Sequence, residues 1–479
     1  MSSRPGNIAA KLPAPASGPA PRAGAGRIKK VVGYYRARRF HIPATFMTQT
    51  GASPSSAVAD ARVDATQYDY DVAIVGAGPV GLALAGWLAR RGGTRALRVA
   101  LIDAREPDAS LDDPRALALS HGSRTLLDSI GWPADATPIE RIHVSQRGCF
   151  GRTVIERDEH GVPALGYVVR YGSLVHALSA AVRASGCDWI SSSIARAPRQ
   201  DEHGVSLPIE AVSTQSGAQP STQSGARSGA NPADAASQRT LRTRMVINAE
   251  GGLYHEAAQT RLAAQPTRRD YRQSALVALV SVSAPQPRVA WERFTGEGPL
   301  ALLPLGGPRQ ADYSLVWCCD PDQAARRMQL PDAQWLAELQ WAFGSRMGRF
   351  ERVGARAAFP LGLNALSTLT DRHIASIGNA AQTLHPVAGQ GLNLGLRDAH
   401  ALLDALAHHG PRPAALRAFA ARRAFDRRVT ISTTDMLARA FTVDFMPLAA
   451  LRGLALSALD FVPPAKTALA RQMIFGQRR

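Results

Sequence analysis

The feature that most constrains the fold is a glycine-rich loop set between a short apolar strand and a helix. The run Tyr70–Val75 is mostly apolar and ends in glycine, which predicts a parallel strand buried on both faces. A helix pattern follows over Val80–Arg91, and a second strand is predicted over Leu97–Asp103. Strand, loop, helix and strand in this order form a βαβ unit. The chain is therefore predicted to contain an α/β domain with a parallel sheet.

The loop reads G-x-G-x-x-G and predicts a dinucleotide site. Gly76 permits the tight turn, Gly78 lets the backbone approach a pyrophosphate, and Gly81 allows close packing of helix on strand. The helix N-terminus offers free amides to the phosphates. Asp103 ends the second strand, where an acid binds a ribose hydroxyl. The alternative is an ordinary βαβ turn with a surface aspartate, and the motif alone does not separate FAD from NAD.

A second glycine-rich loop lies within Asp371–Asp398. A strand predicted over Ile374–Ile377 leads into it, and a helix pattern leaves it, so backbone amides and a helix N-terminus would face a ligand. The alternative is a glycine-rich connection that binds nothing. The residues predicted to form this site are Gly378, Asn379, Pro386, Gly389, Gly391, Leu392 and Asn393.

Composition excludes several classes of protein. The net charge is +18, but residues 1–59 hold nine Lys or Arg and no acid, so half of the excess belongs to that leader. The rest has no Lys/Arg block with interleaved aromatics, which argues against a nucleic-acid partner and fits an anionic cofactor or an anionic membrane surface. No apolar run approaches the roughly 18 to 20 residues of a spanning helix. The four cysteines lack C-x-x-C spacing, so neither a disulfide scaffold nor a metal site is predicted.

Two segments have the composition of flexible chain. Residues 1–68 are rich in Pro, Ala, Gly and Ser with a basic patch, and three interpretations stay open: a transit peptide, a basic membrane-touching arm, or a start upstream of the true one at Met47. Residues 200–240 contain STQSGAQP followed directly by STQSGARS, which predicts a poorly ordered insertion that is dispensable for the chemistry.

The remaining chain is predicted to be rich in strands and then helical. Helices should dominate from Asn393 to Gln472, with Pro463 and Pro464 breaking the last part. The elements expected before them are strands over Ser274–Val282, Leu300–Pro304 and Tyr313–Cys319, and a helix over Asp332–Phe343.

Five stretches together resemble the FAD-dependent aromatic hydroxylases, and within them the ubiquinone-biosynthesis hydroxylases of the UbiH/UbiF/VisC type. The resemblance covers about residues 69–478, and its most specific stretch is HPVAGQGLNLGLRD, which begins at His385. The others are DVAIVGAGPVGLALA, DDPRALALSHGSRTLLDSIG, GYVVRYGSLVHAL and WERFTGEGPLALLPL.

The resemblance implies FAD as the cofactor and assigns residues to it. The three glycines of the first loop and Asp103 would hold the ADP half, and Leu392 and Asn393 would offer backbone amides to the flavin ring. Arg115 would approach the cofactor at the mouth of the site, the alternative being a surface arginine in an ion pair. Asn379 stands where the class has an aspartate, and Glu250 departs from the Asp of the class's Asp-Gly pair.

The resemblance implies hydroxylation of a polyprenylated phenol by O2, with NADH or NADPH as a transient reductant. The sequence agrees with this, since it holds no second G-x-G-x-x-G with which to place a separate nicotinamide domain. His385 is the candidate catalytic residue, although a His-Pro corner is as often structural. Trp291–Leu305 is expected in the core or along a phenol pocket. An FAD monooxygenase for a soluble aromatic and a non-catalytic flavin-binding scaffold of a quinone-synthesis complex are the competing functions.

The predicted fold is α/β: a Rossmann-like FAD-binding domain with an inserted mixed β-sheet substrate domain and a helical C-terminal region. The expected location is the bacterial cytoplasm with peripheral contact to the inner membrane, or the mitochondrial matrix if the leader is a transit peptide. Apart from the leader and the insertion, the predicted parts are 69–199, 241–265 and 366–410 for the FAD-binding domain, 266–365 for the substrate sheet, and 411–479 for the C-terminal helices.

Overall fold

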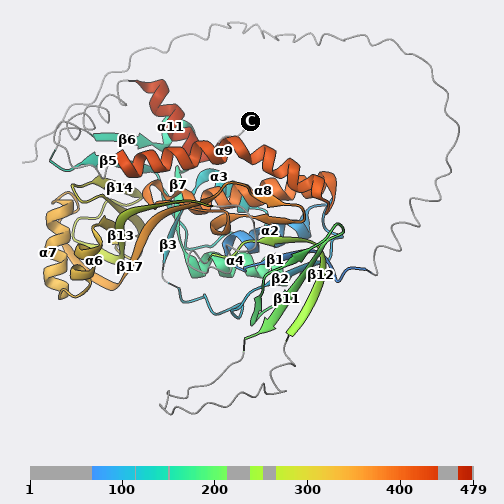
Figure 1. Ribbon diagram of the computed structural model, residues 1–479. Helices are drawn as coiled ribbons and strands as arrows, with labels where there is room; N and C mark the ends of the chain where they lie inside the picture. The colour runs from blue at the N-terminus through green and yellow to red at the C-terminus, as the bar shows by residue number, and fades with distance from the viewer. Residues whose placement is uncertain are drawn as a thin grey trace, which may run out of the picture. The chain divides into compact units, whose positions relative to one another are not determined.

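The computed structural model describes residues 67–113, 115–148, 152–212, 238–251, 266–440 and 462–476, and every structural statement below concerns these residues. A mixed cofactor sheet is centred on β1, which pairs in parallel with β2 on one side and β12 on the other (Figure 1). Its strands are β1 (Tyr70–Val75), β2 (Val99–Ile102), β8 (Asp188–Ile190), β9 (Ser193–Ala195), β10 (Arg199–Gln200), β11 (Val205–Ala211), β12 (Gln238–Asn248), β18 (Thr370–Asp371) and β19 (Ile374–Ser376).

Helix α2 (Pro79–Arg90) is buried between the cofactor sheet and two other helices. It begins with Pro79, whose missing N–H costs nothing at a first helical position, and Gly78 is its N-cap. Its side chains pack in one apolar cluster with those of α4 (Tyr171–Arg183) and α8 (Gln390–His409). The predicted strand, loop, helix and strand at the start of the domain are therefore confirmed.

A second, eight-stranded sheet carries the other half of the molecule. Its order is β20-β17-β13-β16-β15-β14-β5-β6, and β13 and β17 form a long antiparallel pair with three register shifts. The bounds of its strands are β5 (Arg141–Gln146), β6 (Arg152–Glu156), β13 (Pro266–Val282), β14 (Val289–Phe294), β15 (Pro299–Gly306), β16 (Asp312–Cys319), β17 (Phe350–Leu366) and β20 (Gln382–Thr383).

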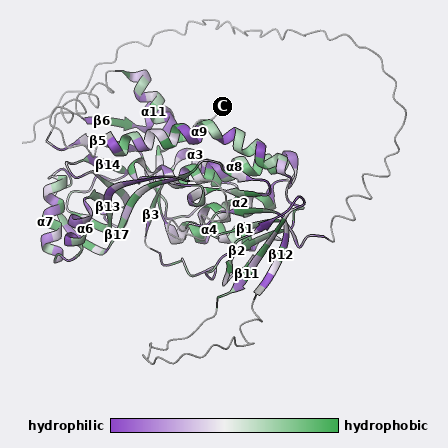
Figure 2. Cartoon of the chain, in the orientation of Figure 1, coloured by the Kyte–Doolittle hydropathy of each residue, from purple (hydrophilic) through white to green (hydrophobic). Residues whose placement is uncertain are grey.

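One face of this sheet is covered by α6 (Pro321–Met328) and α7 (Asp332–Phe343) (Figures 1 and 2). Trp335 of α7 is fully buried and meets Trp317 of β16 edge to face, at 6.0 Å between ring centroids. Because side chains alternate along a strand, the residues between those of this core point to the opposite face, away from α7. That opposite face is the one that meets the cofactor domain.

A small sheet and the C-terminal helices complete the described fold. The sheet joins β3 (Ala116–Ser120) and β4 (Thr137–Ile139) to β7 (Gly166–Arg170), and α3 (His121–Leu127) follows β3. Helix α9 (Pro413–Ala440) runs beside α8 (Figure 1), and α11 (Pro463–Phe475) contacts α3. Among the described helices, none has the length and apolarity needed to cross a bilayer.

The structure corrects three boundaries. Strands β5 and β6, expected within the FAD-binding part 69–199, extend the eight-stranded sheet because β5 pairs in parallel with β14. Strand β11 and the start of β12, expected in the insertion 200–240, form an antiparallel ladder of the cofactor sheet. Pro463 and Pro464 begin α11 rather than break a helix, because proline fits the first helical turn.

Some predictions lie outside the described residues. These are the leader up to residue 66, the centre of the insertion at 213–237, and residues 441–461 of the predicted C-terminal helical region.

Candidate cofactor and substrate site

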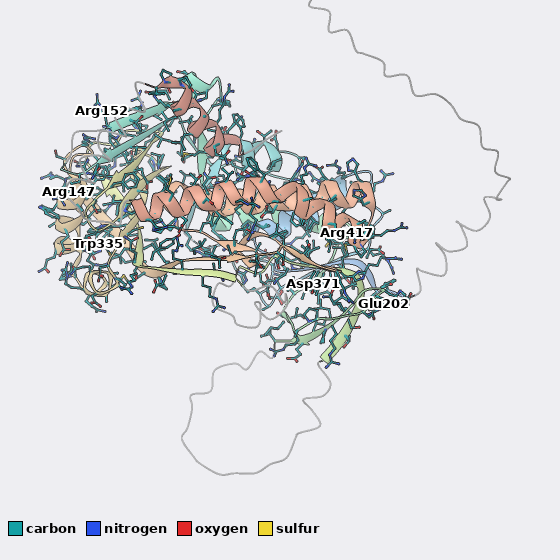
Figure 3. The ribbon with its side chains drawn as sticks, turned by 45° about the horizontal axis from the view of Figure 1, so that its top comes forward. Arg147, Arg152, Glu202, Trp335, Asp371 and Arg417 are labelled. Atoms are coloured by element: carbon teal, nitrogen blue, oxygen red, sulfur yellow. The ribbon has the colours of Figure 1, made fainter. Side chains whose placement is uncertain are left out.

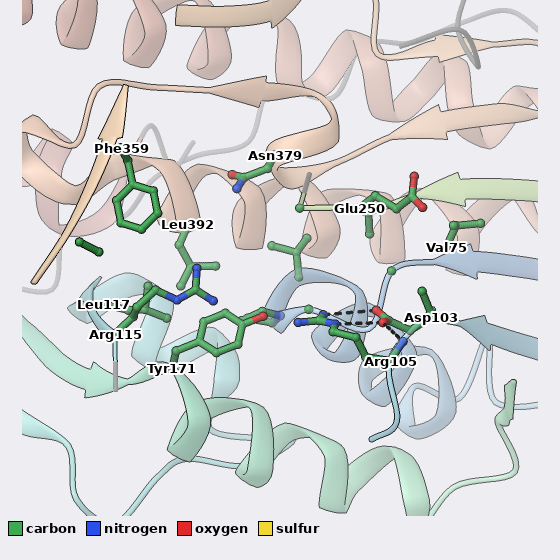
Figure 4. Close-up of a pocket in the computed structure, with 18 of the residues that line it drawn as sticks. Val75, Asp103, Arg105, Arg115, Leu117, Tyr171, Glu250, Phe359, Asn379 and Leu392 are labelled. Atoms are coloured by element: carbon green, nitrogen blue, oxygen red, sulfur yellow. Dashed lines mark hydrogen bonds and ion pairs between the residues drawn. The ribbon is translucent and has the colours of Figure 1, made fainter. Parts of the chain in front are cut away.

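A cavity of about 1200 Å³ lies between the carboxyl ends of the cofactor strands and the eight-stranded sheet. Both glycine-rich loops open into it: Gly76 and Gly78 from the first, and Asn379 and Leu392 from the second (Figure 4). Its far wall is apolar and comes from β13, β16 and β17, with Val277, Val316, Ala355, Ala357 and Phe359 among the lining residues. One end of the cavity is therefore built for a nucleotide and the other for an apolar molecule.

Asp103 organises the nucleotide end. Its Oδ2 accepts a hydrogen bond from the Ala77 N–H at 2.6 Å. Its Oδ1 accepts from Arg105 Nε at 3.1 Å (Figure 4). The hydrogen bonds to this carboxylate raise the pKa of the Arg105 guanidinium. Asp103 thus holds the glycine loop through a hydrogen bond and also lines the cavity. A position on the cavity wall is needed for the predicted contact with a ribose hydroxyl. Sequence reasoning missed Arg105, although it follows Asp103 by only two positions.

The second loop ends at the N-terminus of α8. The N-cap is Gly389, and no side chain caps this end of the helix, which is what a site where backbone amides face a ligand requires. The Asn393 side chain holds this end against β3: its Oδ1 accepts from the Ser120 N–H at 2.8 Å, and its Nδ2 donates to the Gly389 carbonyl at 2.7 Å. The Leu392 side chain lines the cavity.

The other predicted residues of the second loop divide into two groups. Asn379 lies in a 3-10 turn (Gly378–Ala380) and faces the cavity across from Arg115 (Figure 4). Gly378 packs against Val80 of α2, while Pro386, Gly389 and Gly391 shape the loop around Leu392. The glycines and the proline therefore shape the loop, whereas Asn379 and Leu392 are the loop residues that line the cavity.

Arg115 forms an ion pair and also lines the cavity, while its approach to the cofactor stays a prediction. Its Nη2 forms an ion pair with Asp113 at 2.6 Å, and this hydrogen-bonded pairing raises the pKa of the guanidinium. The guanidinium also lies over the Tyr171 ring, 4.5 Å from the centroid, and both residues line the cavity (Figure 4). Glu250, the departure from the class pattern, lines the cavity too, and its N–H donates to Asn248 Oδ1 at 3.2 Å.

His385 does not line the cavity. It is 1 % exposed, its Nδ1 accepts from the Val387 N–H at 3.2 Å, and its Nε2 lies 3.3 Å from Gln273 Oε1. Tyr271 meets the ring edge to face. Burial lowers the pKa of His385 to about 4, so the imidazole is neutral at pH 7. With both nitrogens engaged by the protein, the geometry favours a positioning role, and catalysis by His385 stays a prediction.

Replacing His385 with Gln should reveal which role it has. Because the pKa of the folded-state imidazole lies below its unfolded value of about 6.5, the wild type loses stability as the pH falls from about 6.5 to 4. The variant should lose less over that window, measured as melting temperature against pH. A catalytic His385 would in addition give lower turnover with unchanged FAD content, whereas loss of FAD would show that it shapes the flavin loop.

The stretch Trp291–Leu305, expected in the core or along a phenol pocket, contributes its alternate side chains to the core. Trp291, Leu300 and Leu302, from the stretch Trp291–Leu305, belong to the core under α7. The cavity wall is supplied instead by strands that pair with one another across the sheet. Tyr171 and Phe359 also line the cavity. Tyr171 is placed there by the start of α4, and Phe359 by the register of β17 against β13.

The residues present fit FAD. A Cβ added at Gly78 would meet only the Tyr171 hydroxyl, at 3.8 Å, so within the described protein nothing else fills the space in front of this glycine. The loop amides, the N-terminus of α2 and Asp103 offer the donors and the acceptor that a pyrophosphate and a ribose take. The uncapped start of α8 offers amides to the second half of the cofactor.

Comparisons with known proteins agree with this geometry. Residues 69–424 match the family model described as FAD binding domain. An uncharacterized Synechocystis protein, slr1300, is 31% identical over 85% of this chain and 94% of its own length. The ubiquinone hydroxylase UbiL of Rhodospirillum rubrum is 31% identical over 84% of this chain and 88% of its own. The 3-demethoxyubiquinol 3-hydroxylase of Escherichia coli is 29% identical over 82% of this chain and 96% of its own.

Solved structures show the same fold. The p-nitrophenol 4-monooxygenase PnpA of Pseudomonas putida superposes with a TM-score of 0.63 at 15% identity, covering 85% of this chain and 99% of that one. PqsL of Pseudomonas aeruginosa, titled a probable FAD-dependent monooxygenase, gives 0.59 at 20% identity over 81% of this chain and 99% of that one. The chain therefore belongs to the FAD-binding-domain family of FAD-dependent aromatic hydroxylases, and ubiquinone hydroxylases of this family are among its relatives.

Proposed function

We propose that this protein hydroxylates the phenol ring of a polyprenylated ubiquinone precursor, using O2 and NADH or NADPH. The observation that carries the proposal is the two-ended cavity, which offers phosphate-binding loops at one end and a wall of apolar β-strand residues at the other. The similarity to ubiquinone hydroxylases over most of the chain supports the same substrate class.

FAD supplies the oxygen and hydride chemistry when bound, and the chain supplies binding, orientation and exclusion of water. We assign Gly76, Gly78, Gly81 and Asp103 to the ADP half. We assign the flavin side to Arg115, Asn379 and the loop Gly378–Asn393. NAD(P)H is proposed to reduce the cofactor and leave.

A soluble aromatic substrate is the second candidate. A small aromatic acid would need a free cation at the apolar end, and Arg356 is the lining arginine that comes from the sheet there. Its guanidinium is directed elsewhere, because its Nη1 donates to the Leu330 carbonyl at 2.7 Å and its Nη2 pairs with Asp332 at 2.8 Å. This pairing favours the prenylated phenol.

The test is deletion of the gene followed by mass spectrometry of the lipid quinone extract. Loss of ubiquinone with accumulation of a prenylated phenol lacking one hydroxyl would support the proposal and reveal the ring position. Unchanged ubiquinone, together with hydroxylation of a soluble phenol by the purified protein, would favour the second candidate. Stoichiometric flavin without NAD(P)H-driven turnover on any phenol would leave a non-catalytic scaffold of a quinone-biosynthesis complex.

The proposal includes peripheral contact with a membrane from the bacterial cytoplasm, or from the mitochondrial matrix if the leader is a transit peptide. Trp341 of α7 is 71% exposed, and the Arg147 guanidinium lies 3.3 Å from its ring centroid. Arg152 lies at the same end of the molecule (Figure 3). Exposed tryptophan beside arginine suits the headgroup region of an anionic bilayer.

A double variant with Trp341→Ala and Arg147→Glu should bind phosphatidylglycerol vesicles at least about fivefold more weakly than the wild type, since each basic charge near such a surface contributes about 1 kcal/mol. Sedimentation with the vesicles measures the effect. The exposed Arg417→Glu is the matched control, because Arg417 lies at the opposite end of the molecule (Figure 3). Equal binding by all three proteins would exclude this surface.

A further inference from the structure

The apolar wall of the cavity continues along the eight-stranded sheet to one acidic residue, Glu292 of β14. Cross-strand pairing sets Glu292 opposite Ala301, Ala301 opposite Val316, Val316 opposite Val277, and Val277 opposite Ala357. Directly opposed residues share a face of the sheet, and the last three residues of this row line the cavity. Glu292 therefore stands on the same face, two strand spacings or about 10 Å beyond Val316, next to the residues that line the cavity and not among them.

The two neighbours of Glu292 on this face place it beneath the flavin loop. Phe294, two residues later on the strand, packs in one cluster with Val387 of the second loop. Ala290, two residues earlier, packs in another cluster that includes Ala116 of β3, a cavity-lining residue. Glu292 thus lies between the contact that the sheet makes with the flavin loop and the contact that it makes with β3.

Glu292 is half-buried, and the residues directly opposite it are apolar, while the polar Gln146 stands opposite Phe294 on the same face. Among the described residues, no hydrogen bond or ion pair is found for it. On the same face, β5 presents Val144, β15 presents Ala301, and α9 contributes Leu437 to the cluster beside Phe294. One titratable residue, Cys318 of β16, is close enough to be affected by the charge of Glu292. Burial, and after it the charge of Glu292, raises the pKa of the Cys318 thiol well above its ordinary value.

We propose that Glu292 is the catalytic base that accepts the proton of the substrate's phenol hydroxyl. This inference rests on the proposed function and names the residue that prepares the ring. The phenol O–H bond breaks, an O–H bond forms on the Glu292 carboxylate, and the electron pair stays on the phenolate oxygen. No electron is transferred in this step, and the proton passes to solvent before the next turnover.

The acidity of the group suits this step. Burial raises the pKa of Glu292 to about 7, so the carboxylate is a stronger base than an exposed glutamate and is still available at neutral pH. Below about pH 7 the group is protonated and cannot accept a proton. Product formation should therefore rise with pH through about 7 and level off above it.

The experiment compares the FAD-loaded full-length wild type with Glu292→Gln and with the control Glu351→Gln, an exposed acid on the same sheet. A phenol with a short prenyl chain is the substrate, and hydroxylated product is measured against NAD(P)H consumed from pH 5.5 to 9. Glu292→Gln should keep its FAD and its NAD(P)H oxidation, while product falls roughly 10²- to 10⁴-fold. Its rising limb near pH 7 should disappear.

Two further readouts separate a base from a structural acid. A ring-fluorinated prenylated phenol that ionises below pH 7 should restore product formation in Glu292→Gln, because no base is then needed. In the infrared difference titration of wild type against Glu292→Gln, a carboxyl band should titrate near pH 7, independently of turnover.

The outcomes are distinct. Coupled hydroxylation by Glu292→Gln within about threefold of wild type, or titration of the band near the ordinary value of about 4.3, would overturn the role of Glu292. A wild type that binds FAD but hydroxylates no phenol would instead overturn the proposed function. A large product loss that the acidic phenol does not restore would make Glu292 structural.

Discussion

Gly78→Ala is expected to give a folded protein that no longer retains FAD. The new methyl group would meet no described protein atom closer than the Tyr171 hydroxyl at 3.8 Å, so the fold tolerates it. It would, however, stand in the cavity where the loop backbone has to approach a pyrophosphate. Flavin absorbance per mole of purified protein should fall by at least tenfold, while circular dichroism stays that of the wild-type apoprotein.

Gly81→Ala should fail at the earlier stage of folding. Its Cβ would lie 1.9 Å from the Gly76 carbonyl oxygen, a distance that forces α2 away from the loop. We expect little soluble protein and no cooperative thermal transition. Gly92→Ala is the control, since a Cβ there has no described atom within 4 Å. Stoichiometric FAD in Gly78→Ala would show that the first loop does not hold the pyrophosphate.

The second large effect is expected from Asp398→Ala. Asp398 is fully buried in α8, at the end of the most specific sequence motif, and its Oδ1 accepts from Arg423 Nε at 2.6 Å. Arg423 also donates to Asp426, and Gln382 donates to the other oxygen of Asp398 at 2.7 Å. Without the Asp398 carboxylate, the buried Arg423 guanidinium keeps its ion pair with Asp426, but Asp426 also pairs with Arg397.

Breaking a buried pair in this way costs about 3 to 5 kcal/mol, because the remaining charge has lost its partner. The free energy of unfolding, measured by urea denaturation of the holoprotein, should fall by about that amount. Asp128→Ala is the comparison: its pair with Arg124 is exposed, and its loss should cost less than about 1 kcal/mol. Similar losses from the two variants would mean that the buried network does not hold α8 to α9.

Local patterns in the sequence were sufficient for the elements that present the cofactor loops. The strand Tyr70–Val75 and the helix Asp332–Phe343 have the predicted bounds, because hydrophobic periodicity and the flanking Gly and Pro residues mark them directly. The two glycine loops were recognised for a similar reason, since their function requires particular residue types at fixed short spacing. Asn379 and Leu392, both predicted for the cofactor site, line the cavity.

The other half of the cavity could not be predicted in this way. Whether Glu292 or Trp291 is on the sheet face opposite α7 depends on which face of β14 is buried under α7, and both residues lie in an apolar stretch. The placement of β5 next to β14 depends on a parallel pairing across about 150 residues, for which no local pattern exists. Arg105 follows β2 and Tyr171 begins α4, so these two residues line the same cavity only because the fold places β2 and α4 next to each other.

The order of pairing in the two sheets has a consequence for synthesis of the chain on the ribosome. Strand β5 leaves the ribosome long before its parallel partner β14, and β12 must await β19 near residue 376. At roughly 5 to 20 residues per second, the wait of β5 is on the order of ten seconds. The N-terminal third of the nascent protein therefore cannot complete its native pairing when it emerges, and its apolar strands must be kept from other chains until the later strands arrive.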